Sequence, residues 1–312
     1  MTVTENWVKY TRDEKNTTKY FYNKTQEKYS SEIKNSLYDN PLTTFNVGEE
    51  NSYFDFNDEY MEKFNRVKEL SNYSIHKGNE QGSINPYAIQ WQPHEKTHDK
   101  TNELNEAVDD LLGMVLPMVE KEFYNSKISC IYSLIYYSYV RPQPDPDNRT
   151  TWQWHLDNYP KETYKIIFYN TDVTETTAPF TYLVDENDNP VYMDSHAEWV
   201  GPKDNEARKQ LFGEVPNEWK DDRIPSWWIN QQLERGYKEK MWTAKAGSFC
   251  LFSPNVAHKA TVPYTDPREV ISFTFRPSFR NDERRWSDSL AMNGEHNLHD
   301  WYDGEDIDET TW

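Results

Sequence analysis

Two residues in the middle of the chain, His155 and Asp157, pair an imidazole with a carboxylate at a spacing of two. They lie in Trp152-Gln-Trp-His-Leu-Asp-Asn158, a segment that predicts a strand entering a loop. Side chains on a strand alternate between its faces, so these two point the same way. An imidazole and a carboxylate on one face can hold two adjacent coordination positions of a metal ion.

A second histidine, His258, follows about a hundred residues later. It comes just after the turn-forming Ser253-Pro-Asn255 and opens a predicted strand that neighbours the first. Two histidines and one carboxylate can form a facial triad, which suits non-haem Fe(II) and leaves positions open for a co-substrate and O₂. A single His-x-Asp arises easily by chance, but its placement on strands together with His258 favours a metal site.

An arginine ten residues after His258 can hold an anion near such a site. Arg268 opens the segment Arg268-Glu-Val-Ile-Ser-Phe-Thr-Phe-Arg276, in which period-2 alternation places Arg268 and Ser272 on the same face. A guanidinium can grip a carboxylate in a bidentate fork, and a serine hydroxyl can add a hydrogen bond to it. Other cations that can serve instead are Arg141, Lys165 and Arg276.

The order His-x-Asp, about a hundred residues, His, ten residues, Arg resembles the Fe(II)/2-oxoglutarate-dependent oxygenase superfamily. Within it, the passages Trp154-His-Leu-Asp-Asn158 and Ile166-Ile-Phe-Tyr-Asn-Thr-Asp-Val-Thr-Glu175 look most like the phytanoyl-CoA dioxygenase-like branch. The resemblance covers roughly residues 130–280 and leaves 1–126 and 194–240 uncovered.

The resemblance implies that His155, Asp157 and His258 bind Fe(II) and are the catalytic centre. It implies that Arg268, with Ser272, holds the distal carboxylate of 2-oxoglutarate. The reaction it implies is an O₂-dependent decarboxylation that releases succinate and CO₂ and hydroxylates a substrate. The carboxylate at Asp157 favours hydroxylation, because relatives that halogenate carry a small residue there.

The elements around these residues are expected to be many short strands in one block, preceded by helices. Apolar residues at helical spacing predict helices over 58–71 and 100–123, the second with a kink at Pro117. Alternating and β-branched runs predict strands at 87–91, 128–140, 150–156, 163–170, 179–184, 191–193, 241–244, 248–252, 258–262 and 268–275. This pattern is typical of a mainly β protein with supporting helices, built on a double-stranded β-helix of the jelly-roll or cupin-like kind.

Three regions follow from this pattern. Residues 1–126 are expected to be a leader and supporting helices, 127–280 the double-stranded β-helix core, and 281–312 an acidic tail. An insertion at 194–240 interrupts the strands and carries four tryptophans. Two interpretations of it remain open: a cover over the mouth of the barrel, or a surface elaboration or subunit contact.

Composition limits the partners. The 312 residues carry a net charge of −19, which disfavours nucleic acid and anionic membranes and leaves a small-molecule substrate as the expectation. Cys130 and Cys250 lie in apolar, strand-like runs and are expected to be reduced core thiols. Neither a signal-peptide pattern nor a membrane-spanning run is visible, so a cytoplasmic location is expected. The oligomeric state cannot be derived from the sequence.

One motif points to different chemistry. His94-Glu95-Lys-Thr-His98 matches the H-E-x-x-H pattern of zinc peptidases, in which both histidines face one side of a buried helix. Here Pro93 precedes the motif and its neighbours are polar, which favours a solvated helix start. Besides a zinc peptidase, the sequence leaves open a cupin-type metalloenzyme without 2-oxoglutarate and a jelly-roll binding module without catalysis.

Overall fold

The computed structural model describes residues 41–81, 84–85, 88–91, 101–124, 128–140, 152–157, 163–192, 224 and 226–277, and two short paired strands, β1 (Thr11–Arg12) and β2 (Thr18–Lys19). Several sequence predictions fall outside these residues. They are the H-E-x-x-H motif at His94 and His98, the alternative cation Arg141, most of the insertion at 194–240 and the acidic tail at 281–312.

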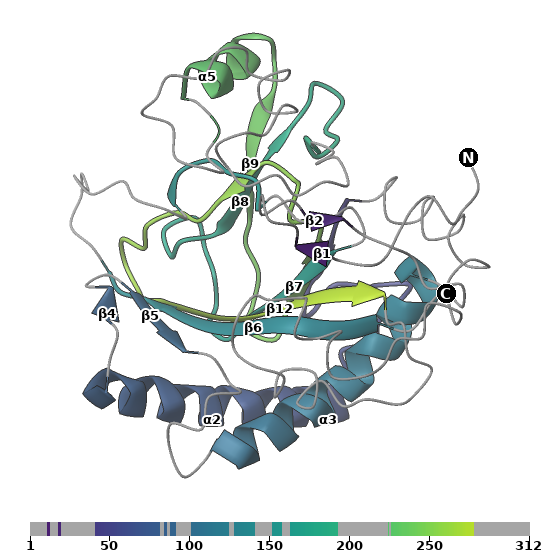
Figure 1. Cartoon of the computed structure of the whole chain (residues 1–312), viewed down its shortest axis with the longest axis vertical. Coiled ribbons are helices and arrows are strands. Elements are labelled where there is room, and N and C mark those ends of the chain that lie inside the picture. Colours follow the sequence, from purple (N-terminus) through teal and green to yellow (C-terminus); the bar gives the residue numbers. More distant parts are fainter. Residues whose placement is uncertain are drawn as a thin grey trace.

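Two antiparallel sheets form the centre of the molecule and face each other (Figure 1). The larger has the order β3 (Leu42–Phe45), β10 (Phe249–Phe252), β7 (Tyr164–Tyr169), β12 (Arg268–Pro277), β6 (Ile128–Ser138), β5 (Ala88–Trp91) and β4 (Ile84–Asn85). The smaller has the order β11 (His258–Lys259), β8 (Phe180–Val184) and β9 (Lys238–Trp242). The predicted mainly β, jelly-roll-like fold class is confirmed.

Two helices cover the outer face of the large sheet (Figure 1): α2 (Asp58–Gln81) and α3 (Thr101–Val119), which continues into the π-helical turn η3 (Glu120–Tyr124). The side chain of Asn57 accepts a 2.9 Å hydrogen bond from the Tyr60 amide, so α2 begins where a cap satisfies its first turn. The helix runs ten residues beyond the predicted end at Ser71, through a stretch without an apolar stripe.

Aromatic rings join the helices to the outer face of the large sheet. Phe249 of β10 stacks on Phe45 of β3 with ring centroids 4.5 Å apart, and it lies 5.3 Å from Phe168 of β7. Tyr60 of α2 is fully buried and donates its hydroxyl proton to the Gly247 carbonyl, just before β10 begins. This packing fixes the backs of the strands whose inner faces meet the small sheet.

The inner face of the large sheet packs against the small sheet. Tyr169, Cys250 and Val270 lie there together with Phe180 of β8 and Trp242 of β9, all buried. Period-2 alternation along the same strands brings Lys165 and Arg268 to this inner face as well. The space between the sheets therefore receives two cations among apolar and aromatic side chains.

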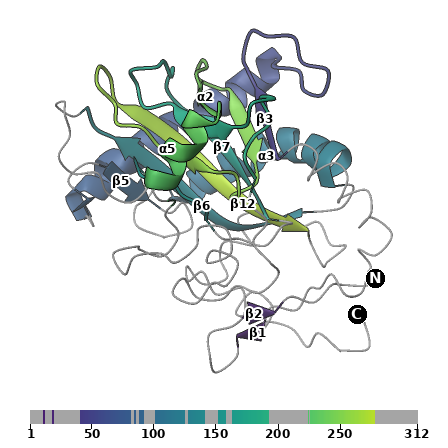
Figure 2. The same cartoon turned by 90° about the horizontal axis from the view of Figure 1, so that it is seen from above.

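The end of the predicted insertion belongs to the core. The strand expected at 241–244 begins three residues earlier as β9, and α5 (Ser226–Glu234) precedes it. The start of this strand was missed because the run Lys238-Glu-Lys240 is charged and shows no hydrophobic alternation. Such a run is compatible with a strand here because β9 lies at the edge of the small sheet with largely exposed side chains. In Figure 1, α5 lies on the opposite side of the large sheet from α2 and α3, beyond the small sheet. Figure 2 views the molecule from the side of α5.

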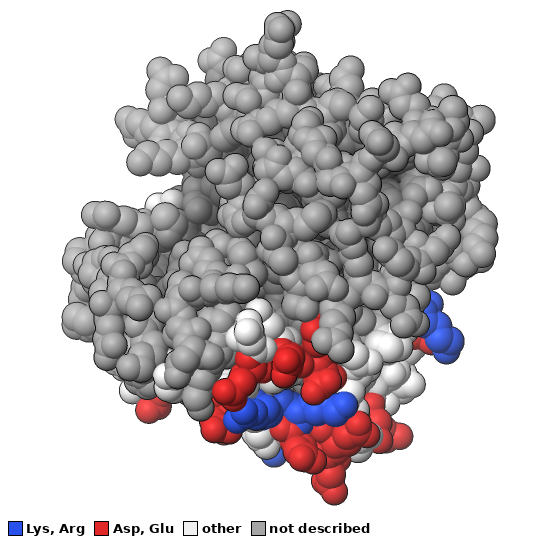
Figure 3. Space-filling model, turned by 60° about the horizontal axis from the view of Figure 1, so that its bottom comes forward, with Lys and Arg blue, Asp and Glu red and all other residues white. Residues whose placement is uncertain are grey.

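The described surface over the helices carries both charges, with acidic side chains in excess (Figure 3). Arg66 of α2 pairs there with Glu69 and with Glu103 of α3, at 3.2 and 2.7 Å. Both cysteines, Cys130 and Cys250, are buried free thiols, as predicted. Among the described residues, no helix combines the length and the apolarity that a membrane crossing requires.

Candidate metal centre

The segment around His155 is held as a bridge and not as the predicted strand. His155 donates its amide proton to the His258 carbonyl at 2.9 Å, and His258 donates to the His155 carbonyl at 3.1 Å. Asp157 donates to the Pro254 carbonyl at 2.9 Å. Residues that pair directly in an antiparallel ladder have close, parallel side chains, so this bridge alone places the two imidazoles side by side.

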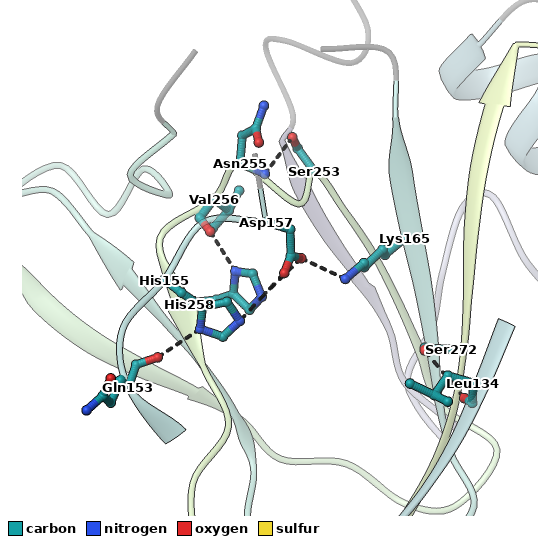
Figure 4. Close-up of polar contacts among 10 residues, drawn as sticks. All are labelled: Leu134, Gln153, His155, Asp157, Lys165, Ser253, Asn255, Val256, His258 and Ser272. Atoms are coloured by element: carbon teal, nitrogen blue, oxygen red, sulfur yellow. Dashed lines mark hydrogen bonds and ion pairs between the residues drawn. The ribbon is translucent and has the colours of Figure 1, made fainter. Parts of the chain in front are cut away.

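The three predicted ligands converge (Figure 4). One ligand atom from each of His155, Asp157 and His258 lies within 4.8 Å of the others. His155 Nε2 is 3.7 Å from Asp157 Oδ1, and His258 Nε2 is 3.6 Å from Asp157 Oδ2. Two atoms that share an ion at about 2.1 Å lie roughly 3–4 Å apart, so the group needs little closure to hold one.

Each histidine is oriented by its own segment. His155 Nδ1 lies 2.8 Å from the Gln153 carbonyl, and His258 Nδ1 lies 2.7 Å from the Val256 carbonyl, two residues upstream in both cases. A carbonyl oxygen only accepts, so each Nδ1 carries the proton and each Nε2 presents its lone pair to the centre. Hydrogen bonds of this kind fix ring orientation and increase the basicity of a metal-binding imidazole.

Residues that alternate with the ligands face the other way. Trp154, Leu156 and Ala257 are buried in a cluster with Ile229 of α5, as predicted for a tryptophan on the face opposite His155. The Ile224 amide adds a 2.7 Å hydrogen bond to the Trp154 carbonyl. Lys259 lies 4.5 Å from the centre of the Trp154 ring. The described part of the insertion thus packs behind the ligand segment and supports it.

Asp157 contacts a cation that the sequence offered only as an alternative carboxylate anchor. Lys165 Nζ donates to Asp157 Oδ2 at 2.7 Å (Figure 4). Burial raises the pKa of Asp157, but the ammonium group of Lys165 lowers it, and the resulting pKa lies far below the usual value of an aspartate. The carboxylate is therefore ionised and ready to bind a cation throughout the physiological pH range.

Arg268 lies deeper between the sheets, with 8% of its surface exposed. Its guanidinium donates to the Ala178 carbonyl beside β8. Within the described part of the chain, no carboxylate forms an ion pair with it. Burial lowers its pKa, yet a guanidinium stays charged in proteins. A buried cation without a paired anion is costly, and an anionic ligand would remove that cost.

Ser272 is buried on the same face as Arg268, four residues further along β12. Its hydroxyl donates to the Leu134 carbonyl of β6 at 3.4 Å, a long hydrogen bond. Four residues of strand span roughly 13 Å, so Ser272 and Arg268 do not lie side by side. A role for Ser272 beside Arg268 stays a prediction.

Aromatic side chains enclose His258. Phe180 and Phe252 lie with their ring centroids 5.4 and 5.3 Å from the imidazole, and both are buried. The two imidazoles themselves lie 4.2 Å apart, tilted by 48°. These rings keep water from the far side of His258 and hold its Nε2 toward Asp157.

The sequence matches no known protein-family profile. No characterised protein in a curated collection matches it either.

Solved structures with a similar arrangement include AviO1 from Streptomyces viridochromogenes Tue57, which is 9% identical, with a TM-score of 0.45 over 80% of this chain and 94% of that one. The epimerase SnoN from nogalamycin biosynthesis, in complex with Fe³⁺, α-ketoglutarate and nogalamycin RO, is 11% identical, with a TM-score of 0.45 over 85% and 91%. EctD from S. alaskensis, with 2-oxoglutarate and 5-hydroxyectoine, is 12% identical, with a TM-score of 0.45 over 82% and 78%.

Two of these three structures contain 2-oxoglutarate. At such identities and TM-scores, the likeness assigns neither a residue role nor a reaction to this chain.

Proposed function

We propose that this protein is an Fe(II)- and 2-oxoglutarate-dependent dioxygenase that hydroxylates a small molecule. The observation that carries the proposal is the convergence of His155, Asp157 and His258, with both Nε2 lone pairs directed at one carboxylate. Two imidazoles and a carboxylate are the donor set of non-haem Fe(II) sites with open positions. A closed structural zinc site would use a fourth protein ligand, and the described cluster has three candidates.

Arg268 supports 2-oxoglutarate as the co-substrate. The guanidinium is buried between the sheets near Phe180, which also packs on His258. A dicarboxylate that binds the metal through its 2-oxo acid end extends its second carboxylate away from the ion, and a bidentate arginine fits that group. A cupin-type enzyme without 2-oxoglutarate would supply no such carboxylate to the guanidinium of Arg268.

Iron and 2-oxoglutarate, when bound, supply the oxidative decarboxylation that releases succinate and CO₂. The chain supplies positions: His155 and His258 each present a single nitrogen, and Asp157 presents an ionised carboxylate. Phe180 and Phe252 keep the surroundings of His258 apolar, which limits water at the reacting centre. A carboxylate ligand at position 157 favours hydroxylation over halogenation, because it leaves no room for a halide.

A small-molecule substrate fits the charge of the protein. At a net charge of −19, the chain repels polyanions such as nucleic acids. An expected cytoplasmic location gives access to 2-oxoglutarate and Fe(II).

The test is an anaerobic titration of purified apo-protein with Fe(II) and 2-oxoglutarate. We expect a weak visible charge-transfer band when both are present, and no band with Fe(II) alone. Arg268→Ala is expected to weaken 2-oxoglutarate binding by roughly 100-fold, as expected for loss of a charged bidentate contact worth about 3 kcal/mol. Its control, Arg66→Ala, removes an exposed arginine of α2 and is expected to leave the titration unchanged.

Three results would count against the proposal. Metal binding without any 2-oxoglutarate signal would favour a cupin-type metalloenzyme. Ligand binding that persists without metal would favour a binding module. Unchanged iron stoichiometry in folded His155→Ala, Asp157→Ala and His258→Ala would remove the metal site itself.

A further inference from the structure

We propose that Lys165 is a positioning residue of the metal centre, which holds one oxygen of Asp157 so that the carboxylate presents the other oxygen alone to the ion. The inference rests on the proposed metal site but not on 2-oxoglutarate. Lys165 is thereby given a role at the metal centre in addition to the three ligands and Arg268.

The position of Lys165 is unusual for a lysine. It lies in β7, between β10 and β12 in the middle of the large sheet, opposite Phe252 on one side and Thr274 on the other. Both of these neighbours are buried, and the lysine side chain is 21% exposed. Lysine is among the residues least often found inside a protein, and it is tolerated there when it is paired.

The ammonium group reaches the centre from the opposite sheet. Asp157 follows a segment bridged to β11, whereas Lys165 belongs to the large sheet, and the 2.7 Å contact joins them across the interior. The lysine hydrogen bond is made to Oδ2, which also lies 3.6 Å from His258 Nε2, whereas Oδ1 lies 3.7 Å from His155 Nε2 and receives no hydrogen bond from Lys165. Lys165 therefore distinguishes two oxygens that are chemically equivalent in a free carboxylate.

This distinction matters for the number of open positions. A carboxylate can bind an ion through one oxygen or through both. With two histidines and one oxygen, three of the six positions of an octahedral ion stay open. Binding through both oxygens closes one of them. A co-substrate that chelates through two atoms together with O₂ needs three positions, so an Asp157 held by Lys165 keeps the site competent.

The charge of Lys165 has a second effect, on the strength of metal binding. A cation a few ångströms from the metal repels it and draws electron density from the shared carboxylate. Lys165 thus makes the metal bind less tightly than the three ligands alone would allow. Removing the ammonium should strengthen metal binding while reducing the number of open positions, a combination that simple damage to the fold does not produce.

The experiment uses Mn(II) as the probe on full-length apo-protein, without 2-oxoglutarate. Water proton relaxation counts the water molecules on bound Mn(II), and the same titration gives the affinity. We expect three bound waters in the wild type and two in Lys165→Met, whose methylene stem retains most of the packing. We expect Lys165→Met to bind Mn(II) roughly tenfold more tightly. Lys165→Arg, which keeps a donor and a positive charge, should restore the wild-type count.

Lys63→Met is the matched control. It removes a lysine that pairs with Glu59 at 3.1 Å on the surface of α2, and it should match the wild type in both readouts. Thermal unfolding checks that each variant is folded. If Lys165→Met does not fold, Lys165→Leu, a shorter side chain with neither a charge nor a donor, takes its place with the same expectation.

The outcomes separate this inference from the proposed function. An unchanged water count in Lys165→Met, or weaker Mn(II) binding, overturns the role of Lys165. A wild type that binds no metal overturns the metal site and this inference together. A wild type that binds Mn(II) and Fe(II) but gives no 2-oxoglutarate signal overturns the proposed function, while the water count still decides the role of Lys165.

Discussion

Arg268 and Glu269, which are adjacent in β12, point to opposite faces of the large sheet. Arg268 points between the sheets, whereas Glu269 is 1% exposed on the helix side and accepts a 2.8 Å hydrogen bond from the Asn170 amide group. Burial raises the pKa of Glu269 to about 7, although Asn170 and Lys68 of α2 act to lower it. A carboxyl group that stays protonated near neutrality makes the stability of this region depend on pH.

Glu269 gives a prediction about that dependence. Above about pH 4.5 the unfolded chain releases this proton while the folded protein keeps it, so the free energy of unfolding falls as the pH rises towards 7. Glu269→Gln should remove this loss, which amounts to about 3 kcal/mol. Urea unfolding of both proteins from pH 4.5 to 8 measures it. Glu175→Gln, at an exposed glutamate, is the control. Parallel curves for wild type and Glu269→Gln would contradict the prediction.

For these residues, the sequence predicted that His155, Asp157 and His258 come together, but not how each side chain is held. His155, Asp157 and His258 stood out because their types and order are specific. The Lys165–Asp157 contact could not be predicted, since it joins a strand of the large sheet to the ligand segment, and only the assembled fold brings the two together. Nor does a sequence pattern reveal that Arg268 lacks a carboxylate partner in the described structure, because pairing is a property of the assembled interior.

Among the elements, α5 bears on the metal centre without contributing a ligand. Ile229 of this helix is 3% exposed and packs in the cluster that contains Trp154 and Leu156, on either side of His155. Ligands keep their geometry when the layer behind them is firmly packed. The helix therefore couples the packing of the insertion to the affinity for metal.

Ile229→Ala is expected to lower the free energy of unfolding by about 2–4 kcal/mol, because it leaves a cavity. It should also weaken Mn(II) binding roughly tenfold, as outer-layer substitutions do in metal sites. Leu111→Ala in α3 is the matched control, since it opens a cavity on the far side of the large sheet. It should cost similar stability with unchanged Mn(II) affinity. Equal effects of both variants on metal binding would show that α5 has no specific role.

The strands with a run of apolar, aromatic and β-branched residues were predicted with ends within about two residues of those observed. β7 and β12 are examples, because both of their faces are buried and rich in aromatic or β-branched residues. Several other elements were not. The strand expected at 258–262 ends at Lys259, the one expected at 191–193 forms only an isolated bridge, and β3 and α5 were not predicted. The stretch at 150–156 was predicted as a strand, but around His155 its described part forms an isolated bridge. The end of α2 and the start of β9 are polar, and tertiary contacts determine the secondary structure of such segments.

For the whole molecule, the large sheet separates two buried clusters, and each contains one thiol. Cys130 of β6 belongs to the cluster under the helices, and Cys250 of β10 to the cluster between the sheets. Burial raises the pKa of the Cys250 thiol above its usual value. Neither thiol can react without opening of the layer that covers it.

Labelling of the native protein with a disulfide-exchange reagent should therefore be slow, and both thiols should react at one common rate set by global unfolding. In denaturant, two thiols should react at once. A single fast thiol in the native protein would reveal that one layer opens independently of the other. Cys130→Ala identifies which thiol is responsible.

The bridge between His155 and His258 also affects the order in which the chain folds and binds metal. The two halves of the metal centre are about a hundred residues apart in the chain, and closing a loop of that length has an entropic cost that later contacts must offset. As a ribosome delivers the chain, His155 and Asp157 emerge long before their partner, and a growing protein cannot close the centre around a metal. If the proposed function holds, such a chain is expected to reach its nearly complete fold first and to acquire iron in one of its last steps of maturation.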